Sequence, residues 1–317
     1  MTKTEKTFNQ IIEKINAAKT VAVFAHVSYD PDGLGALYGL STFLKKLGKK
    51  VEMFVDSKIT ELDARFFDVT MLKDQPKECD LMIMVDTPNA GRLGRYAEVF
   101  KNHPNTIRLD HHSGIFHDAK IELTLPYTSA CEVVLELIEK MGQKPTKQTA
   151  TYLYAGILTD TDGFLIDTVG KSTFENALKL IEYGADIHKA SDMLLRTQSV
   201  QQFNLSKRMA EKLEIHGDVA ISSLTTKDFK QTGTKPNQCM NFSNKLVYLD
   251  GINFSCLIKQ EQNNVFSCSL RAKAPYNVAK VAERFGGGGH ILAAACKIKG
   301  SEKDAKTKIL QAIKELR

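Results

Sequence analysis

The sequence predicts an α/β protein with two parts, an N-terminal doubly wound parallel sheet and a smaller C-terminal α/β domain. Strand-like apolar runs alternate with amphipathic helical stretches in the first part, and strand-rich patterning begins at Val219. Between them lies a charged, Gln-rich stretch with a helical pattern. The length of 317 residues also favours two domains. We expect a first domain over residues 1–187, a helical linker over 188–213 and a second domain over 214–317.

Helices and strands are expected to alternate along the first domain. Residues 80–86 hold a continuous apolar run, which is typical of a parallel strand buried on both faces. Gly48 stands where it can end the preceding helix as a C-cap. The expected strands are residues 21–25, 51–55, 80–86 and 106–110, and the expected helices are residues 5–18, 34–47, 92–101, 130–141, 148–158 and 172–183.

The second domain is expected to be richer in strands. The stretch 231–245 is polar and shows no periodicity, so we expect it to be a surface loop. The expected strands are residues 219–224, 246–249, 253–260 and 264–271, and the expected helices are residues 277–284 and 302–316.

Composition bounds the class of protein. The 43 Lys and Arg residues exceed the 37 Asp and Glu residues by six, which suits an anionic substrate but is too small an excess for a DNA-coating protein. The six Cys residues form no C-x-x-C pair, the first residues are polar and do not resemble a cleavable leader, and no run reaches the ~18 apolar residues of a membrane span. We therefore expect a cytoplasmic protein with reduced thiols and no membrane association.

Acidic and histidine side chains gather at predicted strand ends or just after them. They are His26, Asp30, Asp32, Asp86, Asp110, His111, His112 and Asp160. A single Asp after a strand is usually a helix cap, but so many such residues at one sheet edge favour a metal site. Carboxylates and imidazoles without thiols suit Mn²⁺ or Mg²⁺ better than Zn²⁺.

Clusters of this kind commonly hold two cations about 3.5–4 Å apart that activate a water and neutralise phosphate oxygens. This chemistry indicates hydrolysis of a phosphoester or phosphoanhydride. It leaves one histidine to protonate the leaving oxygen or to bind phosphate, and His112 is the candidate for that role.

A second candidate site follows Phe285, where four glycines, Gly286 to Gly289, precede His290. Successive glycine N–H groups can form an anion-binding nest ahead of a helix N-terminus, although a flexible linker has the same composition. Arg271 ends a predicted strand and could bind a phosphate through two N–H groups, although an exposed structural arginine would look the same.

These motifs together resemble the DHH phosphoesterase superfamily with its DHH-associated C-terminal domain, and their layout is similar to the bacterial nanoRNase/pAp phosphatase subfamily. The resemblance rests on His-x-x-x-Asp-x-Asp at His26, the Asp of Val85-Asp86-Thr87, Asp110-His111-His112, Thr159-Asp160-Thr161 and Gly-Gly-Gly-His, in this order over roughly residues 10–315. Three departures touch the shape of the substrate pocket: Ala36, Asp162 and Cys296 stand where the family often has Ser, Gly and Gly.

The resemblance implies roles for individual residues. It implies that the first domain is the catalytic, metal-binding DHH domain, in which His26, Asp30 and Asp86 hold one Mn²⁺. Asp32, Asp86, His111 and Asp160 would hold the other, with Asp86 as the bridge. Asp110 would orient an imidazole or meet the metal. The second domain would bind substrate through Arg271, Gly287, Gly288, Gly289 and His290. The cleft between the domains would admit a short nucleotide.

These expectations lead to a Mn²⁺-dependent (or Mg²⁺-dependent) phosphohydrolase that degrades short RNA or DNA oligonucleotides to mononucleotides and dephosphorylates pAp. An alternative substrate is pApA or cyclic di-AMP. Inorganic pyrophosphatase activity fits the glycine loop less well, and a processive exonuclease such as RecJ would need an added oligonucleotide-binding barrel. A non-catalytic nucleotide-binding regulatory module is the alternative of another class. A homodimer is the default expectation for assembly.

Overall fold

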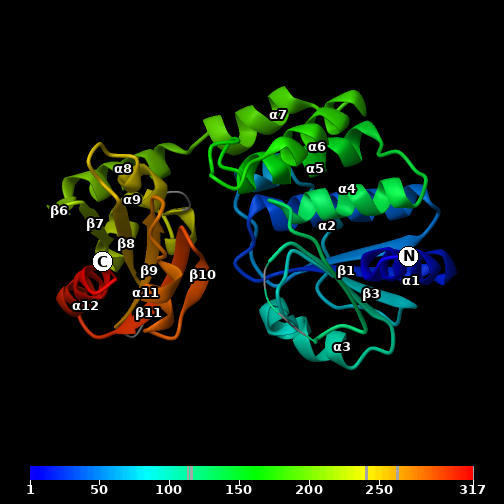
Figure 1. Cartoon of the computed structure of the whole chain (residues 1–317), viewed down its shortest axis with the longest axis horizontal. Coiled ribbons are helices and arrows are strands. Elements are labelled where there is room, and N and C mark those ends of the chain that lie inside the picture. The colour runs from blue at the N-terminus through cyan, green and yellow to red at the C-terminus, as the bar shows by residue number, and fades with distance from the viewer. Residues whose placement is uncertain (113, 115–116, 240–241, 262–263, 317) are drawn as a thin grey trace. The chain divides into compact units, whose positions relative to one another are not determined.

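The computed structural model describes residues 1–112, 114, 117–239, 242–261 and 264–316, and it divides the chain into two compact units. Unit 1 comprises Met1–Thr197 and unit 2 comprises Gln198–Arg317. The two units differ in sheet type, because unit 1 has a wholly parallel sheet and unit 2 a mixed one (Figure 1).

Unit 1 contains a five-stranded parallel sheet in the order β2-β1-β3-β4-β5. Its strands are β1 (Thr20–Ala25), β2 (Lys50–Val55), β3 (Leu81–Val85), β4 (Thr106–Asp110) and β5 (Ile121–Thr124). The strand order reverses between β1 and β3, and open parallel sheets bind their ligands beyond the carboxyl ends of the strands at such a switch point. The expected strands lie within a residue of their predicted positions, while β5 was not predicted.

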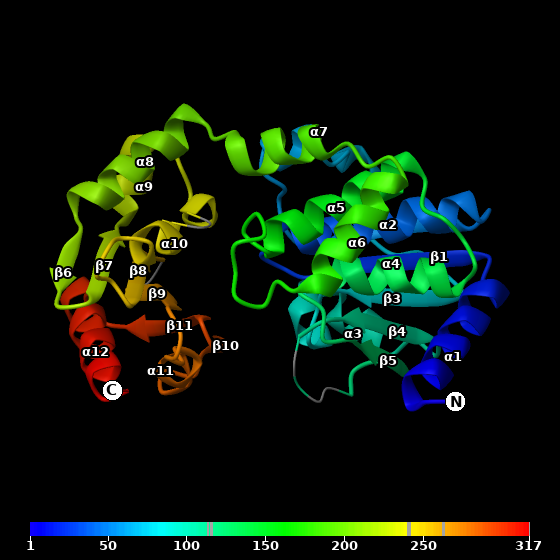
Figure 2. The ribbon, with the colours of Figure 1, turned by 45° about the horizontal axis from the view of Figure 1, so that its top comes forward.

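Helices cover both faces of this sheet, as a doubly wound fold requires (Figure 2). The larger core lies on the face of α2, α4 and α5, and a smaller aromatic core around Phe24 and Phe54 lies on the face of α3. The helices are α1 (Lys3–Ala17), α2 (Pro31–Lys46), α3 (Ala97–Lys101), α4 (Ala130–Lys140), α5 (Lys147–Asp160), α6 (Lys171–Glu182) and α7 (Ile187–Ser191). Shorter turns are the 3-10 segments η1 (Asp63–Arg65), η2 (Val69–Met71) and η3 (Ala90–Tyr96) and the π-helical η4 (Asp192–Arg196).

Unit 2 contains a six-stranded mixed sheet in the order β10-β11-β9-β8-β7-β6, in which β7 and β8 are parallel. The strands are β6 (Glu214–His216), β7 (Val219–Leu224), β8 (Phe254–Gln260), β9 (Val265–Ala272), β10 (Gly288–His290) and β11 (Ala293–Lys299). The helical segments are α8 (Val200–Glu211), α9 (Thr226–Thr232), η5 (Pro236–Cys239), α10 (Phe242–Val247), α11 (Ala279–Glu283) and α12 (Glu302–Lys314). One core lies against α11 and α12, and a second lies against α8 and α10.

Three predictions of secondary structure are wrong. The stretch 231–245 is not a surface loop, because η5 and α10 lie there and bury Cys239 and Phe242. The predicted strand 246–249 is the end of α10 followed by a turn. The helical stretch 188–213 is interrupted between η4 and α8, where Ser199 caps α8 through the backbone N–H of Gln202.

Candidate metal centre

The loop after β1 and the first turn of α2 supply three of the predicted ligands. His26 directly follows β1, and Asp30 is the N-cap of α2, where its Oδ1 accepts the Gly33 N–H at 2.9 Å. Pro31 at the first helical position lacks an N–H that would need a partner. Asp32 lies one residue further into the helix and is 1% exposed. The short sequence between strand and helix therefore holds His26, Asp30 and Asp32 at the carboxyl edge of the sheet.

Asp86 follows β3, the neighbour of β1, and lies between two imidazoles. Its Oδ2 is 3.3 Å from His26 Nε2, and its Oδ1 is 3.4 Å from His111 Nε2. The side chain of Asp86 is 3% exposed, and its φ of 50° is in the left-handed region that Asp tolerates better than most residues. Each carboxylate oxygen thus faces a different histidine, which is the arrangement that a bridging ligand needs.

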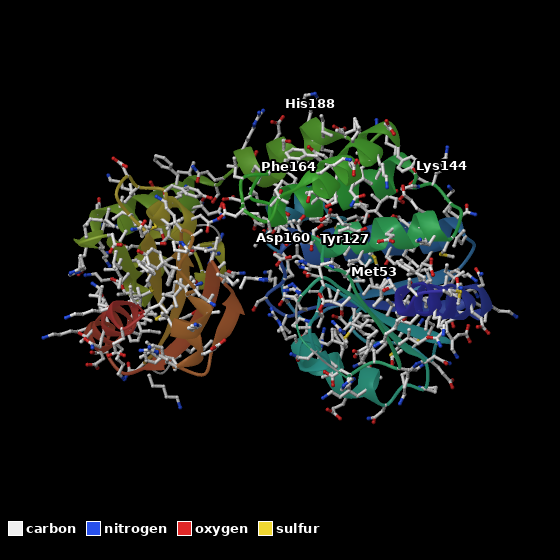
Figure 3. All side chains as sticks on the ribbon, in the orientation of Figure 1. Met53, Tyr127, Lys144, Asp160, Phe164 and His188 are labelled. Atoms are coloured by element: carbon white, nitrogen blue, oxygen red, sulfur yellow. The ribbon has the colours of Figure 1, made fainter. Side chains whose placement is uncertain are left out.

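Asp160 comes from the C-terminal end of α5 (Figure 3), not from the end of a strand as predicted. Close packing of α5 on α2 brings it to the site. At Gly156 a Cβ atom would lie 2.5 Å from Asp32 Oδ1 and 2.2 Å from Cys131 Sγ, so a larger residue would force the two helices apart. Asp160 Oδ2 lies 3.7 Å from His111 Nε2.

The structure brings the six predicted ligands together in two groups with Asp86 between them. The ligand atoms of His26, Asp30 and Asp86 lie within 4.8 Å of one another, and so do those of Asp32, His111 and Asp160. The resemblance implies the same two sets except that it also assigns Asp86 to the second cation, and Asp86 is not a member of the second group. Asp86 contacts both groups through the two histidines.

Both histidines present Nε2 to this cluster. His26 Nδ1 lies 2.7 Å from the Val27 carbonyl, and His111 Nδ1 lies 3.3 Å from the Tyr127 carbonyl. Because a carbonyl can only accept, the Tyr127 contact places the proton of a neutral His111 on Nδ1 and its lone pair on Nε2. At His26 the Val27 carbonyl favours the same tautomer, whereas Arg92 Nη2, which can only donate, lies 3.1 Å from the same Nδ1. Metal-binding histidines in proteins are held in this way.

The carboxylates repel one another in the protein without a cation. Burial, followed by the charge of Asp86, raises the pKa of Asp32 to about 7. Burial, followed by the charge of Asp32, raises the pKa of Asp160 well above its usual value. Burial alone would raise the pKa of Asp86, but hydrogen bonds with His111 and His26 lower it. Divalent cations would relieve this repulsion, and the donor set of carboxylate oxygens and imidazole nitrogens fits Mn²⁺ or Mg²⁺.

The same interactions act on the histidines. Burial lowers the pKa of His26, but its hydrogen bonds with Asp30 and Asp86 outweigh this and raise the pKa well above the usual value. Burial likewise lowers the pKa of His111, but the hydrogen bond with Asp86 and the negative charge of Asp160 raise that pKa well above the usual value. In the absence of metal, the cluster therefore retains protons that a cation has to displace.

Asp110 and His112 lie beside the cluster and contact each other. Asp110 Oδ1 accepts from His112 Nδ1 at 2.8 Å, while His112 Nδ1 is 3.7 Å from Asp86 Oδ1. Asp110 is fully buried, whereas the side chain of His112 is 27% exposed. This contact occupies His112 Nδ1 and fixes the direction of the ring.

Sequence reasoning missed two arginines at this site. Arg92 Nη2 lies 3.1 Å from His26 Nδ1, and the Arg92 carbonyl accepts the Val27 N–H at 2.7 Å. Arg108 Nη1 donates to Asp110 Oδ2 at 2.7 Å. The two-residue spacing of Arg108 and Asp110 in one strand was a usable signal, because it places both side chains on one face. No local signal marks Arg92.

The predicted substrate residues lie in unit 2. Arg271 is on β9, where its Nε donates to Asn244 Oδ1 at 2.6 Å and its Nη1 donates to the Leu270 carbonyl at 2.9 Å. Gly288, Gly289 and His290 form the exposed edge strand β10, paired with Ala293, Ala294 and Ala295 of β11. The expectation of a helix N-terminus after the glycine loop is therefore wrong, because a strand follows.

The glycines of this loop differ in what they tolerate. A Cβ at Gly287 would lie 2.1 Å from the Ala295 carbonyl oxygen, and a Cβ at Gly289 would lie 2.5 Å from the Ala293 carbonyl oxygen. A Cβ at Gly288 would meet nothing within 4 Å. The missing side chains of Gly287 and Gly289 thus allow this segment to approach the backbone of β11 closely, while Gly288 has no such packing requirement.

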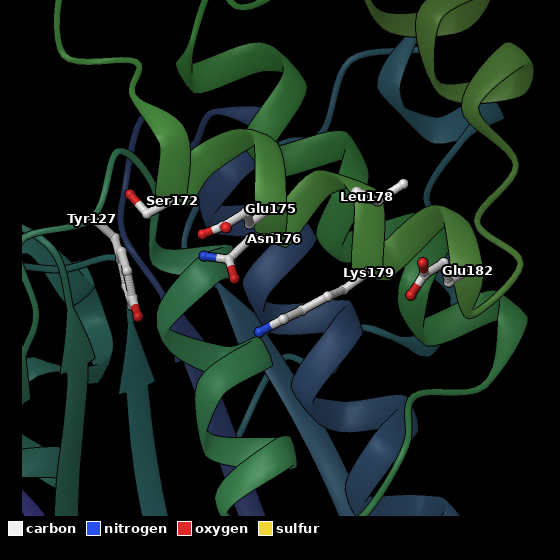
Figure 4. Close-up of a pocket in the computed structure, with 7 residues that line it drawn as sticks. All are labelled: Tyr127, Ser172, Glu175, Asn176, Leu178, Lys179 and Glu182. Carbon is white, nitrogen blue, oxygen red and sulfur yellow. The ribbon is translucent and has the colours of Figure 1, made fainter.

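A pocket of about 440 Å³ lies away from the predicted ligands, mainly on α6 (Figure 4). Its lining residues are Tyr127, Ser172, Glu175, Asn176, Leu178, Lys179 and Glu182. None of them belongs to the metal-ligating groups, and their charges are of both signs. The pocket is therefore not the site of the chemistry, even though the carbonyl of Tyr127 is the one that faces His111.

None of the helices in the described parts of the chain is long and apolar enough to cross a membrane.

Comparison with known proteins identifies the family. Residues 20–157 match the DHH family N-terminal domain, and residues 216–316 match the DHHA1 domain. The chain therefore belongs to the DHH phosphoesterases, as the sequence motifs predicted. Both units of the fold and the metal-ligating groups of unit 1 agree with this membership.

Two relatives and one solved structure are similar over much or all of this chain. The probable bifunctional oligoribonuclease and PAP phosphatase NrnA of Streptococcus mutans is 29% identical over 299 residues, which are 90% of this chain and 92% of the relative. The cyclic-di-AMP phosphodiesterase PdeA of Listeria monocytogenes is 28% identical over 228 residues, which are 70% of this chain and 34% of that protein. The crystal structure of an exopolyphosphatase-related protein from Bacteroides fragilis has a TM-score of 0.91 at 22% identity, covering 99% of this chain and 98% of the other, and it shows the fold.

Proposed function

We propose that this protein is a Mn²⁺-dependent two-metal phosphohydrolase that degrades short oligonucleotides (nanoRNA) to mononucleotides and removes the 3′-phosphate of pAp. The observation that carries the proposal is the position of Asp86 between two buried imidazoles, each with its own carboxylates. A single cation would need only one of these groups. The doubled arrangement is the one that phosphoester hydrolysis uses.

His26, Asp30 and Asp86 would hold one cation, and Asp32, Asp86, His111 and Asp160 would hold the other. When bound, such ions lower the pKa of a water and neutralise charge on phosphate oxygens. The chain itself supplies the remaining groups. His112, held at Nδ1 by Asp110, would give a proton from Nε2 to the leaving oxygen. Asp32 and Asp86 are buried, whereas the side chains of Asp30 and Asp160 are 38% and 33% exposed, so water and substrate would reach the cluster at those two ligands.

Arg271 and the segment Gly287–His290 would bind the phosphate or the 3′ end of the substrate. The guanidinium of Arg271 is held by Asn244, which reduces the freedom that it would lose on binding a phosphate. His290 is exposed on the edge strand β10. The choice of short oligonucleotides and pAp is supported by the similarity to the oligoribonuclease and PAP phosphatase of Streptococcus mutans over about nine-tenths of both chains.

A phosphodiesterase for pApA or cyclic di-AMP is the second candidate, because the Listeria phosphodiesterase has a similar identity to this chain. That similarity covers only 34% of the Listeria protein, so the larger part of it has no counterpart here. The same metal chemistry would serve both activities. They differ in substrate alone.

One panel of substrates tests the proposal. Purified protein with Mn²⁺ is given a diribonucleotide, a longer RNA, pAp, pApA, cyclic di-AMP and pyrophosphate, and initial rates are compared. We expect the diribonucleotide to be cleaved faster than cyclic di-AMP or pyrophosphate, with pAp also dephosphorylated. Faster cleavage of pApA or cyclic di-AMP than of the diribonucleotide would favour the second candidate. If no substrate gave a product, the remaining alternative would be a non-catalytic nucleotide-binding module.

A further inference from the structure

Arg108 on β4 forms an ion pair with Asp110 in the protein interior. Its Nη1 donates to Asp110 Oδ2 at 2.7 Å, and its Nη2 donates to Thr124 Oγ1 at 2.8 Å. The same Nη2 lies 3.4 Å from Glu122 Oε2, and Glu122 is the register partner of Arg108 on β5. Arg108 is 2% exposed and Asp110 is 0% exposed. Removing one partner of such a pair leaves a buried charge, so the pair acts as one unit.

The second oxygen of Asp110 serves the two histidines that follow. Oδ1 accepts the backbone N–H of His111 at 2.9 Å and that of His112 at 3.3 Å. It also accepts from His112 Nδ1 at 2.8 Å. One oxygen is therefore bound by the guanidinium, and the other is bound by the backbone and ring of the His-His motif. A rotation of the carboxylate would break both sets of bonds together.

We propose that Arg108 is a positioning residue that fixes Asp110 as the acceptor for His112 and prevents Asp110 from ligating a cation. The inference rests on the proposed function, in which His112 transfers a proton to the leaving oxygen. Asp86, Asp110, His111 and His112 place ligand atoms within 4.8 Å of one another and could by distance alone form a third metal site. A permanently charged guanidinium at 2.7 Å from Asp110 opposes a cation there. This third group is thus an orienting network.

The test compares Arg108→Met, which removes the charge, with Arg108→Lys, which keeps it, and with the control Glu122→Gln, which leaves the bond to Asp110 intact. We measure kcat and KM for a diribonucleotide with Mn²⁺, and metal content by mass spectrometry. Arg108→Met should lower kcat by about 10- to 100-fold, the usual effect of losing a partner that orients a metal-site group. KM should stay at the wild-type value, and the variant should hold no fewer ions than wild type. Arg108→Lys should recover most of kcat, and Glu122→Gln should behave like wild type.

A folded Arg108→Met variant with wild-type kcat would overturn the inference, and so would a loss of bound metal. If Arg108→Met does not fold, the double variant Arg108→Met/Asp110→Asn removes both buried charges. Its kcat should equal that of Asp110→Asn alone, because Arg108 acts through Asp110. A further loss in the double variant would show that Arg108 acts elsewhere and would overturn the inference.

A readout without substrate separates this inference from the proposed function. In the metal-free protein, proton NMR should show a slowly exchanging His112 Nδ1–H, assigned by its loss in His112→Gln. This resonance should disappear or exchange rapidly in Arg108→Met. If wild-type protein cleaves no phosphoester but keeps this behaviour, the proposed function fails while Arg108 still orients His112. If the resonance is unchanged in Arg108→Met, the positioning role fails whatever the activity.

Discussion

Replacing Asp86 by Asn isolates the charge on which the two-metal proposal depends. Asn has nearly the same size and also tolerates the left-handed backbone that Asp86 adopts at a φ of 50°. Asp86→Ala would remove the carboxylate but would add about 1–2 kcal/mol of backbone strain. A loss of activity in Asp86→Asn therefore reports on the carboxylate and not on the stability of the turn after β3.

The size of the effect follows from the charges of the cluster. The carboxylates of Asp30, Asp32, Asp86 and Asp160 together balance two divalent cations, whereas Asp86→Asn leaves one positive charge uncompensated and removes the shared ligand. We expect the variant to lose at least one of the two ions. A catalytic cation contributes several kcal/mol to the transition state, and a loss of about 3–5 kcal/mol corresponds to a roughly 10²- to 10⁴-fold lower kcat.

The assay measures metal per chain after gel filtration and kcat for a saturating diribonucleotide with added Mn²⁺. Asp74→Asn is the matched control, because the Asp74 side chain is 97% exposed and lies outside the ligand groups. Melting curves in EDTA show whether the fold is retained. Asp86→Asn protein that still holds two ions, or that turns over within a few-fold of wild type, would refute the bridging role.

Three further outcomes follow from the same geometry. In Gly33→Ala, the new Cβ would lie 3.0 Å from Asp86 Oδ2 and 3.1 Å from His26 Nε2. The affinity for Mn²⁺, measured by calorimetry, should therefore fall, even though Ala stabilises a helix by up to about 1 kcal/mol relative to Gly. An unchanged affinity would contradict this geometry. The affinity for Mn²⁺ should rise as pH increases through about 7, because the raised pKa of Asp32 keeps a proton on that ligand at lower pH. Calorimetry in two buffers of different ionisation enthalpy should detect the release of this proton. An affinity that does not change with pH would contradict this reasoning. His290→Ala should raise KM for the diribonucleotide by about 10-fold or more, as expected for one lost hydrogen bond to a charged phosphate. The metal content should stay unchanged. A loss of metal would show that His290 belongs to the metal centre.

The sequence allowed most of unit 1 and its ligand groups to be predicted. The strands before His26 and Asp86 are buried and consist largely of apolar residues, so they are recognisable without tertiary information. The strand before His111 is also buried, although only two of its five residues, Ile107 and Leu109, are apolar. Once those strands are placed in a parallel sheet, their carboxyl ends share an edge. The position of Asp160 could not be predicted in this way, because it depends on the close approach of two helices at Gly156, which a strand pattern cannot reveal.

Unit 2 was predicted less well for a physical reason. The strands β10 and β11 contain Gly288–His290 and Ala293–Ala295, which have low intrinsic strand preference and are held by pairing with their neighbours. In the stretch 231–245, Phe242 belongs to a buried cluster with residues of α8, β7, α9 and β8, so the polar composition of the stretch was misleading. In unit 1, Arg108 was overlooked because two of its partners, Glu122 and Thr124, lie on β5, a strand that was not predicted.

In the proposed function, the residues that act in the chemistry and those that choose the substrate belong to different units. All six predicted ligands, together with Asp110 and His112, lie within Met1–Thr197, which has its own cores. Arg271 and His290 lie within Gln198–Arg317. A substitution in the second group can therefore change which phosphoester is bound without altering the donor atoms around the cations. This arrangement would offer a physical reason why the proteins similar to this chain include both a probable bifunctional oligoribonuclease and PAP phosphatase and a cyclic-di-AMP phosphodiesterase. It also means that Arg271→Lys, which keeps the charge but loses the planar fork held by Asn244, should change the order of substrates in the panel while the metal content stays the same.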